Sequence, residues 1–113
     1  MAFIIDGHNL IGVLPDISLS QPDDEARLID RLLSYRAAVG SDMVVFFDRS
    51  RYGALPGDHR SAPHSTAGIE IRYAAAGQSA DDAIVEFLRG CKQPGQFAVV
   101  TNDHGLINRV RAM

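Results

Sequence analysis

The chain has 113 residues, of which 46% are hydrophobic and 22% are charged, and its formal net charge at neutral pH is −3. This composition is typical of a single folded domain over residues 1–113 and argues against disorder or a uniformly basic nucleic-acid-binding surface. No apolar stretch is long enough to span a bilayer and no basic leader is visible, so we expect a cytoplasmic protein. The single cysteine, Cys91, excludes an internal disulfide and is predicted to be a small core residue.

Four apolar runs predict strands in this chain. They cover residues 2–5, 43–47, 69–73 and 97–101, and the alternation in the third run indicates a strand with one exposed side. Between the second and third runs, residues 49–68 show no periodicity and are rich in Gly, Pro, Ser, Arg and His. This segment predicts a long loop that is functional or mobile.

Helix-start residues separate the first two predicted strands. Ser20 is a suitable N-cap, and Pro22 suits the first turn. The acids at 23–25 complement the helix dipole, and we interpret them as a solvated helix start. Gly40 predicts that this helix ends in a left-handed conformation.

Two further helices complete the predicted order of elements. Ser79 and Asp82 have capping-box spacing at the start of one helix, and residues 105–111 form a closing helix. The order strand, helix, strand, strand, helix, strand, helix predicts an α/β fold. In such a fold a mainly parallel sheet is covered by helices on both faces.

Carboxylates follow three of the predicted strands, at Asp6, Asp48 and Asp103. Because ligands bind at the carboxyl ends of parallel strands, we expect these acids, together with Asp81 at a helix start, to form an acidic pocket. Several carboxylates at one edge repel one another unless a cation or proton relieves them, and Mg²⁺ or Mn²⁺ prefers such oxygen ligands. The histidines have no zinc-binding spacing.

Each acid also has a purely structural interpretation. Asp6 could serve merely as a turn residue with Gly7, and Asp103 merely as the cap of the last helix. Asp48 could merely begin a loop, and the pair Asp81 and Asp82 could merely complement the helix dipole. Asn9 could hold its loop through an Asx turn. The residues alone therefore leave these alternatives open.

Four short motifs, taken in order, resemble the NYN branch of the PIN-like ribonucleases, particularly the YacP-like group. They are Ile5-Asp6-Gly7-His8-Asn9-Leu10-Ile11, Val45-Phe46-Phe47-Asp48, Ser79-Ala80-Asp81-Asp82-Ala83-Ile84 and Val99-Val100-Thr101-Asn102-Asp103. The resemblance extends from residue 2 to about residue 110. It implies a three-layer α/β/α fold with strand order 3-2-1-4-5 and metal-dependent RNA cleavage that leaves a 5′-phosphate and a 3′-hydroxyl. Here the fifth strand is missing, so the expected order is 3-2-1-4.

The resemblance also implies roles for individual residues. Asp6, Asp81 and Asp103 match the family's metal-binding acids, which would hold Mg²⁺ or Mn²⁺, and Asp82 could share or replace the role of Asp81. Asn9 matches the family's asparagine after the first strand, and Asp48 matches its acid after the second strand.

The long predicted loop concentrates positive charge beside the expected acidic edge. Arg49, Arg51 and Arg60 could pair with RNA phosphates, and Tyr52 could stack on an unpaired base. A solvated loop with incidental arginines is the alternative.

Together these features predict a metal-dependent endoribonuclease that uses a metal-activated water. The alternative is a catalytically inactive RNA-binding or ribosome-binding module that uses the same edge. RNA is the expected partner, ribosome association is a further possibility, and the missing last strand leaves a sheet edge through which we expect a homodimer.

Overall fold

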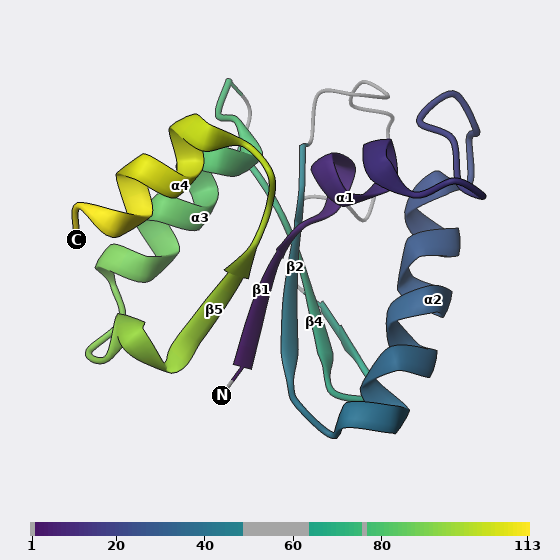
Figure 1. Cartoon of the computed structure of the whole chain (residues 1–113), viewed down its shortest axis with the longest axis horizontal. Helices are drawn as coiled ribbons and strands as arrows, with labels where there is room; N and C mark the ends of the chain where they lie inside the picture. Colours follow the sequence, from purple (N-terminus) through teal and green to yellow (C-terminus); the bar gives the residue numbers. More distant parts are fainter. Residues whose placement is uncertain (1, 49–63, 76) are drawn as a thin grey trace.

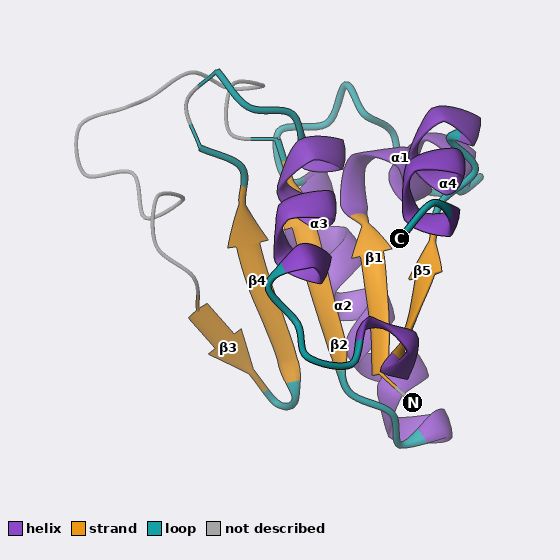
Figure 2. Cartoon of the chain, turned by 90° about the vertical axis from the view of Figure 1, so that its left-hand side faces the viewer, coloured by secondary structure: helices purple, strands orange, loops and turns teal. Residues whose placement is uncertain are grey.

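The computed structural model describes residues 2–48, 64–75 and 77–113. Within these residues five strands form one sheet in the order β3-β4-β2-β1-β5, as Figure 2 shows. The strands are β1 (Ala2–Asp6), β2 (Met43–Phe47), β3 (His64–Thr66), β4 (Ile69–Tyr73) and β5 (Phe97–Val100). The order of β4, β2, β1 and β5 is the predicted 3-2-1-4.

Strand β1 is an inner strand of the sheet, next to the edge strand β5. It pairs in parallel with β2 on one side and β5 on the other, so that Ile4 is opposite both Val44 and Val99. Strand β4 pairs in parallel with the far side of β2. The carboxyl ends of all four parallel strands therefore point to the same edge of the sheet (Figure 1).

The antiparallel strand β3 corrects the prediction of a continuous loop over residues 49–68. It pairs with β4 through a two-residue turn, Ala67-Gly68, in which both residues have positive φ, 47° and 87°. Such turns match the twist of a hairpin, but alanine rarely adopts positive φ, so the sequence does not indicate the turn. The extra strand lies beyond β4, at the opposite edge from the expected fifth strand of the family.

Helices cover both faces of the sheet (Figure 1). They are α1 (Gly7–Val13), α2 (Asp24–Val39), α3 (Ala80–Arg89) and α4 (His104–Arg111), with a 3-10 helix, η3 (Pro94–Gln96), before β5. None of the helices among the described residues is long and apolar enough to cross a membrane.

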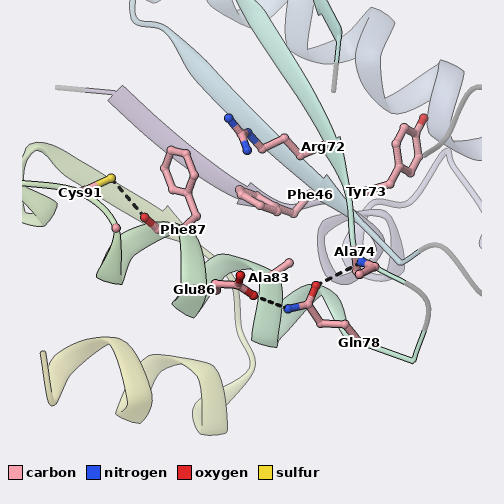
Figure 3. A pocket seen from close by; sticks show the side chains of 11 residues that line it. Phe46, Arg72, Tyr73, Ala74, Gln78, Ala83, Glu86, Phe87 and Cys91 are labelled. Atoms are coloured by element: carbon pink, nitrogen blue, oxygen red, sulfur yellow. Dashed lines mark hydrogen bonds between the residues drawn. The ribbon is translucent and has the colours of Figure 1, made fainter. Parts of the chain in front are cut away.

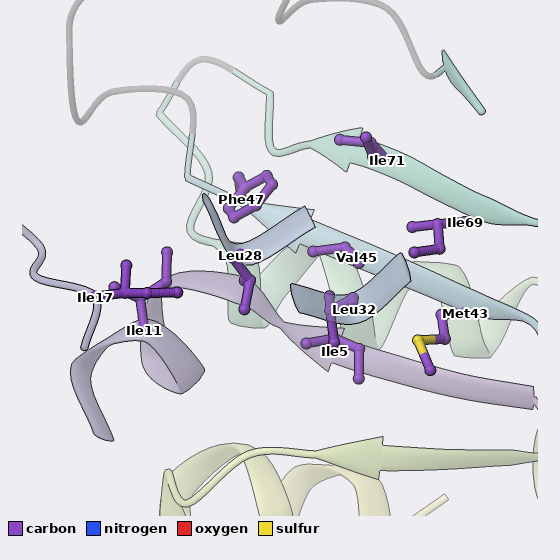
Figure 4. Packing of buried hydrophobic residues seen from close by; sticks show 10 residues of the cluster. All are labelled: Ile5, Ile11, Ile17, Leu28, Leu32, Met43, Val45, Phe47, Ile69 and Ile71. Atoms are coloured by element: carbon purple, nitrogen blue, oxygen red, sulfur yellow. The ribbon is translucent and has the colours of Figure 1, made fainter. Parts of the chain in front are cut away.

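Alternation along the strands divides the core into two clusters. Ile5 and Phe47 face α1 and α2, where they join the cluster that Figure 4 shows, including Leu28 of α2. Their neighbours Ile4 and Phe46 face α3 and α4. The three-layer α/β/α arrangement follows from this alternation, since each face of a buried strand needs its own cover.

The helix ends confirm some predictions and correct others. Gly40 ends α2 with φ 71°, and the Ser79 side chain caps α3 by accepting a hydrogen bond from the amide of Asp82. Helix α2 begins at Asp24 rather than near Ser20, because Ser20 lies in a turn where its hydroxyl hydrogen-bonds that of Ser18 at 2.7 Å.

Helix α1 was not predicted, and Gly7 makes it possible. A Cβ atom on Gly7 would lie 2.4 Å from Cε1 of Phe47 and 3.0 Å from the carbonyl oxygen of Phe46. The helix can therefore start directly at the end of β1 only because this residue has no side chain. The close approach places the next residue, His8, inside the protein.

Candidate active site

Four aspartates meet at the carboxyl edge of the sheet, each at the end of one element. Asp6 ends β1 and is only 5% exposed, while Asp48 directly follows β2. Asp103 is the N-cap of α4 after β5, and Asp81 lies in the first turn of α3. The structure therefore gathers acids that are far apart in the chain, as the sequence predicts, while their role as a binding pocket remains a prediction.

A hydrogen-bonded segment ties the ends of β1 and β5 together. The Thr101 hydroxyl donates to Oδ2 of Asp6 at 3.2 Å and accepts from the amide of Asp103 at 3.1 Å. Next to it, the Asn102 amide donates to Oδ1 of Asn9 at 3.0 Å. Thus Asn9 holds the β5 side of the site, and Thr101, which was not among the predicted site residues, orients Asp6.

Asp103 has the capping role that the sequence allowed. Its Oδ1 accepts a hydrogen bond from the amide of Leu106 at 3.1 Å. This contact and its hydrogen bond with Asp81 lower the pKa of Asp103. One carboxylate oxygen suffices for the cap, so the capping role is compatible with a second role at the edge of the sheet.

The pKa values of Asp6 and Asp81 are raised. Burial is the main cause for Asp6, partly offset by the Thr101 hydroxyl, and the charges of Asp48 and Asp103 add to the effect. The pKa of Asp81 rises to about 6 because of burial and repulsion by Asp6 and Asp103. The cluster thus carries more negative charge than its surroundings neutralise, and a proton or cation is favoured there.

This donor set fits a hard divalent cation. Carboxylate oxygens are the ligands that Mg²⁺ and Mn²⁺ prefer, and the mutual repulsion that raises the pKa of Asp81 is what such a cation relieves. The three acids Asp6, Asp81 and Asp103 are nevertheless more widely spaced than the ligands of a compact site. Among the described residues, the one group whose candidate ligand atoms lie within 4.8 Å of one another is His8, Asp24 and Glu25.

The burial of Asp24 and Glu25 corrects the interpretation of this segment as a solvated helix start. Asp24 is fully buried and Glu25 is 9% exposed. Oδ1 of Asp24 accepts from the amide of Glu25 at 2.7 Å, and Oε2 of Glu25 lies 2.8 Å from Nε2 of His8. The partner in α1 is 17 positions earlier, so local sequence did not reveal it.

The structure separates Asp82 from Asp81. Oδ1 of Asp82 forms an exposed ion pair with Arg109 of α4 at 2.9 Å, and this contact lowers the pKa of Asp82. The expectation that Asp82 shares the role of Asp81 is thus less favoured, since its carboxylate already has a cationic partner.

The predicted RNA-binding residues Arg49, Arg51, Tyr52 and Arg60 lie outside the described residues.

A pocket of about 550 Å³ lies between β4 and α3 (Figure 3). Its wall carries Arg72 stacked over the Phe87 ring at 5.0 Å, and Cys91, half-buried beyond the end of α3, donates to the carbonyl of Phe87. None of the four aspartates lines this pocket.

Comparison with known proteins identifies the family. The model of the YacP-like NYN domain matches residues 3–112, almost the whole chain. The chain belongs to the YacP-like NYN domain family. This family is of the PIN-like nuclease type, and the fold found here agrees with that membership.

Solved structures of this family show the same fold. A crystal structure of Rae1 (YacP) from Bacillus subtilis has a TM-score of 0.64 and 16% identity, covering 99% of this chain and 74% of that one. The structure of a tryptophan-to-leucine mutant of the same protein has a TM-score of 0.66 and 19% sequence identity. That match covers 98% of this chain and 75% of the mutant chain. No curated protein sequence matches the chain.

Proposed function

We propose that this YacP-like NYN domain is a divalent-metal-dependent endoribonuclease that hydrolyses RNA phosphodiester bonds. The observation that carries the proposal is the gathering of Asp6, Asp81 and Asp103 at one edge of the sheet, where burial and the charges of the other two acids raise the pKa of Asp81 to about 6. Uncompensated carboxylates at the carboxyl edge of a parallel sheet suit a site that receives a cation together with a phosphate substrate. Membership in a nuclease-type family supports the same reaction.

The proposal gives each residue of the site a role. Asp6, Asp81 and Asp103 hold Mg²⁺ or Mn²⁺, which when bound activates water and stabilises charge on the attacking and leaving oxygens. Thr101 orients Asp6 by donating to its carboxylate. Asn9 fixes the chain between β5 and α4 by accepting from the Asn102 amide.

Asp48 has two contacts that suit a supporting role in the site. Its Oδ1 accepts from the amide of Ala80 at 2.6 Å, and its backbone amide approaches the His8 ring. The carboxylate therefore fixes the start of α3 directly before Asp81. It also adds to the negative charge that Asp81 experiences.

The substrate is proposed to be RNA bound by Arg49, Arg51, Arg60 and Tyr52, with the cytoplasm as the place of action. Ribosome association and a homodimer through the edge of the sheet are further parts of the proposal. Within the described residues, β5 pairs only with β1, which leaves its other side for such a contact.

The test is RNA cleavage by the purified protein with and without Mn²⁺. We expect wild type to cut mixed RNAs only with the metal, and Asp6→Asn and Asp103→Asn to lose turnover by orders of magnitude while still binding RNA. Asp30→Asn, an exposed change on α2, is the matched control. Metal-independent cleavage would contradict the proposal, and RNA binding without cleavage under any divalent metal would favour the inactive binding module.

A further inference from the structure

A chain of contacts, buried at its start and partly exposed at Asp48, runs from α2 through α1 to the start of α3. Oε2 of Glu25 lies 2.8 Å from Nε2 of His8, and Nδ1 on the other side of the ring lies 3.4 Å from the backbone amide of Asp48. Oδ1 of Asp48 in turn accepts from the amide of Ala80 at 2.6 Å. Both His8 and Glu25 are at most 9% exposed. The chain thus connects the interior of the protein to the residue before Asp81.

The partners of the His8 ring select one tautomer of its neutral form. A backbone amide can only donate, so Nδ1 of the neutral ring accepts from the Asp48 amide and the ring proton lies on Nε2, while Oδ2 of Asp48 lies 3.6 Å from the same Nδ1. Nε2 therefore donates to the Glu25 carboxylate. The ring also packs against Phe47, with 5.0 Å between centroids, which limits its rotation.

The spacing of His8, Asp24 and Glu25 would also permit a metal ion. Their contacts describe a hydrogen-bonded network, because Nε2 of His8 lies 2.8 Å from Oε2 of Glu25 and Oδ1 of Asp24 accepts from the Glu25 amide at 2.7 Å. A metal ion bound to Nε2 would have to displace the contact between His8 and Glu25.

We propose that His8 and Glu25 are positioning residues that hold Asp48 and, through it, the first turn of α3. Glu25 fixes the ring of His8, and the ring fixes the backbone at Asp48. The carboxylate of Asp48 then fixes Ala80, which is 3% exposed and immediately precedes Asp81. The consequence for catalysis rests on the proposed function, whereas the placement of α3 does not.

Two His8 variants separate the two halves of the network. His8→Asn keeps an acceptor near the position of Nδ1 and loses the donor to Glu25, while His8→Gln keeps a donor near Nε2 and loses the acceptor for Asp48. We expect amide hydrogen exchange at Ala80, followed by NMR, to be faster in His8→Gln than in His8→Asn. Wild-type exchange rates in both variants would overturn the proposal.

A pair of Glu25 variants tests the anchor independently. Glu25→Gln keeps an acceptor for Nε2, so the amide exchange rate of Ala80 should stay close to that of wild type. Glu25→Ala removes the acceptor and should raise that rate. In RNA cleavage, Glu25→Ala should lower kcat on the order of 10- to 100-fold with a smaller change in KM, since a displaced Asp81 still leaves RNA binding intact. Asp30→Ala on the exposed side of α2 is the control for both measurements.

The outcomes distinguish this proposal from the proposed function. Faster exchange at Ala80 in Glu25→Ala, together with a wild type that cleaves no RNA, would retain the positioning network and reject the nuclease. Unchanged exchange in Glu25→Ala would overturn the network even in an active enzyme. A Mn²⁺ or Zn²⁺ ion that binds the Asp6→Asn, Asp81→Asn, Asp103→Asn triple variant and is lost on adding Glu25→Gln would establish a metal site instead.

Discussion

Asp81 and Asp82 are neighbours in the chain, yet their surroundings move their pKa values in opposite directions. Asp81 turns toward Asp6 and Asp103, and burial with repulsion raises its pKa from 3.8 to about 6. Asp82 is paired with Arg109, which lowers its pKa. A helix turn places successive side chains about 100° apart, so one residue step decides which carboxylate faces the acid cluster.

The raised pKa of Asp81 predicts how the stability of the metal-free protein depends on pH. Because the folded state binds this proton more tightly than the unfolded state, the free energy of unfolding should rise as the pH falls from 7 through 6. The raised pKa of Asp6 changes the free energy of unfolding in the same direction. The lowered pKa of Asp103 affects it only below about pH 4. Thermal melts between pH 5 and 7 measure this trend.

Two asparagine variants assign the effect to Asp81. Asp81→Asn should raise the melting temperature of the metal-free protein at pH 7, flatten its pH dependence and weaken the increase that Mn²⁺ causes. Asp82→Asn removes only an exposed ion pair and should leave the Mn²⁺ effect in place. An Mn²⁺ effect that depends on Asp82 and not on Asp81 would reverse the assignment.

At the scale of single elements, helix α1 depends on the absence of a side chain at Gly7. Gly7→Ala would place Cβ 2.4 Å from Phe47, so we expect the free energy of unfolding to fall by about 1–3 kcal/mol, the usual cost of overpacking. Urea denaturation measures the change through a lower midpoint at an unchanged slope.

Gly12 in the same helix provides the control for Gly7. A Cβ atom there meets only Leu19 at 3.5 Å, an ordinary contact, so Gly12→Ala should be neutral or stabilise the protein by up to about 1 kcal/mol. Equal destabilisation by both substitutions would mean that helix α1, rather than the contact with Phe47, responds to the loss of glycine.

The sequence predicts those elements that carry their own pattern. The four parallel strands appear as apolar runs, and Gly40 and Ser79 are visible as helix ends. Helix α1 and strand β3 were missed because α1 depends on the close approach of Gly7 to Phe47 and the turn after β3 places Ala67 at a positive φ that alanine rarely adopts. Neither the contact nor the turn has a local sequence pattern, since both depend on the packed structure.

The candidate site, too, could be predicted only where a local sequence pattern marks its residues. Asp6, Asp48 and Asp103 could be grouped because the ends of parallel strands share one edge of the sheet. The contact between His8 and Glu25 could not be predicted, since a pair of acids at a helix start usually faces solvent and here it is buried under α1. Residue roles at the edge remain predictions until they are tested.

At the scale of the whole molecule, RNA affinity and turnover should depend on different charges. Replacing Arg49, Arg51 and Arg60 with alanine should weaken RNA binding and reduce its salt dependence by about 0.7 in log–log slope for each phosphate that no longer has an arginine partner. Mn²⁺ affinity should remain nearly unchanged, because these residues are not acids of the proposed site. Binding titrations at several salt concentrations provide the measurement.

Arginines elsewhere provide a control of equal charge. Arg27 and Arg31 of α2 are paired with Asp23 and Asp16, and Arg89 lies exposed at the end of α3. Replacing these three with alanine changes the net charge by the same amount, and we expect a smaller change in the salt slope. Equal slopes for the two triple variants would show that net charge, and not the predicted loop, governs RNA binding.

The inner position of β1 has a consequence for the synthesis of the protein. This strand is made before β5, so Ile4 remains unpaired on its second side until Val99 has been made. Closing the long loop between β1 and β5 is slow. Until β5 is made, the unpaired edge of β1 can form non-native pairs with other strands. Asp6 and Asp103 therefore come together only after β5 has been made, so the nascent chain carries no assembled acid cluster before that point.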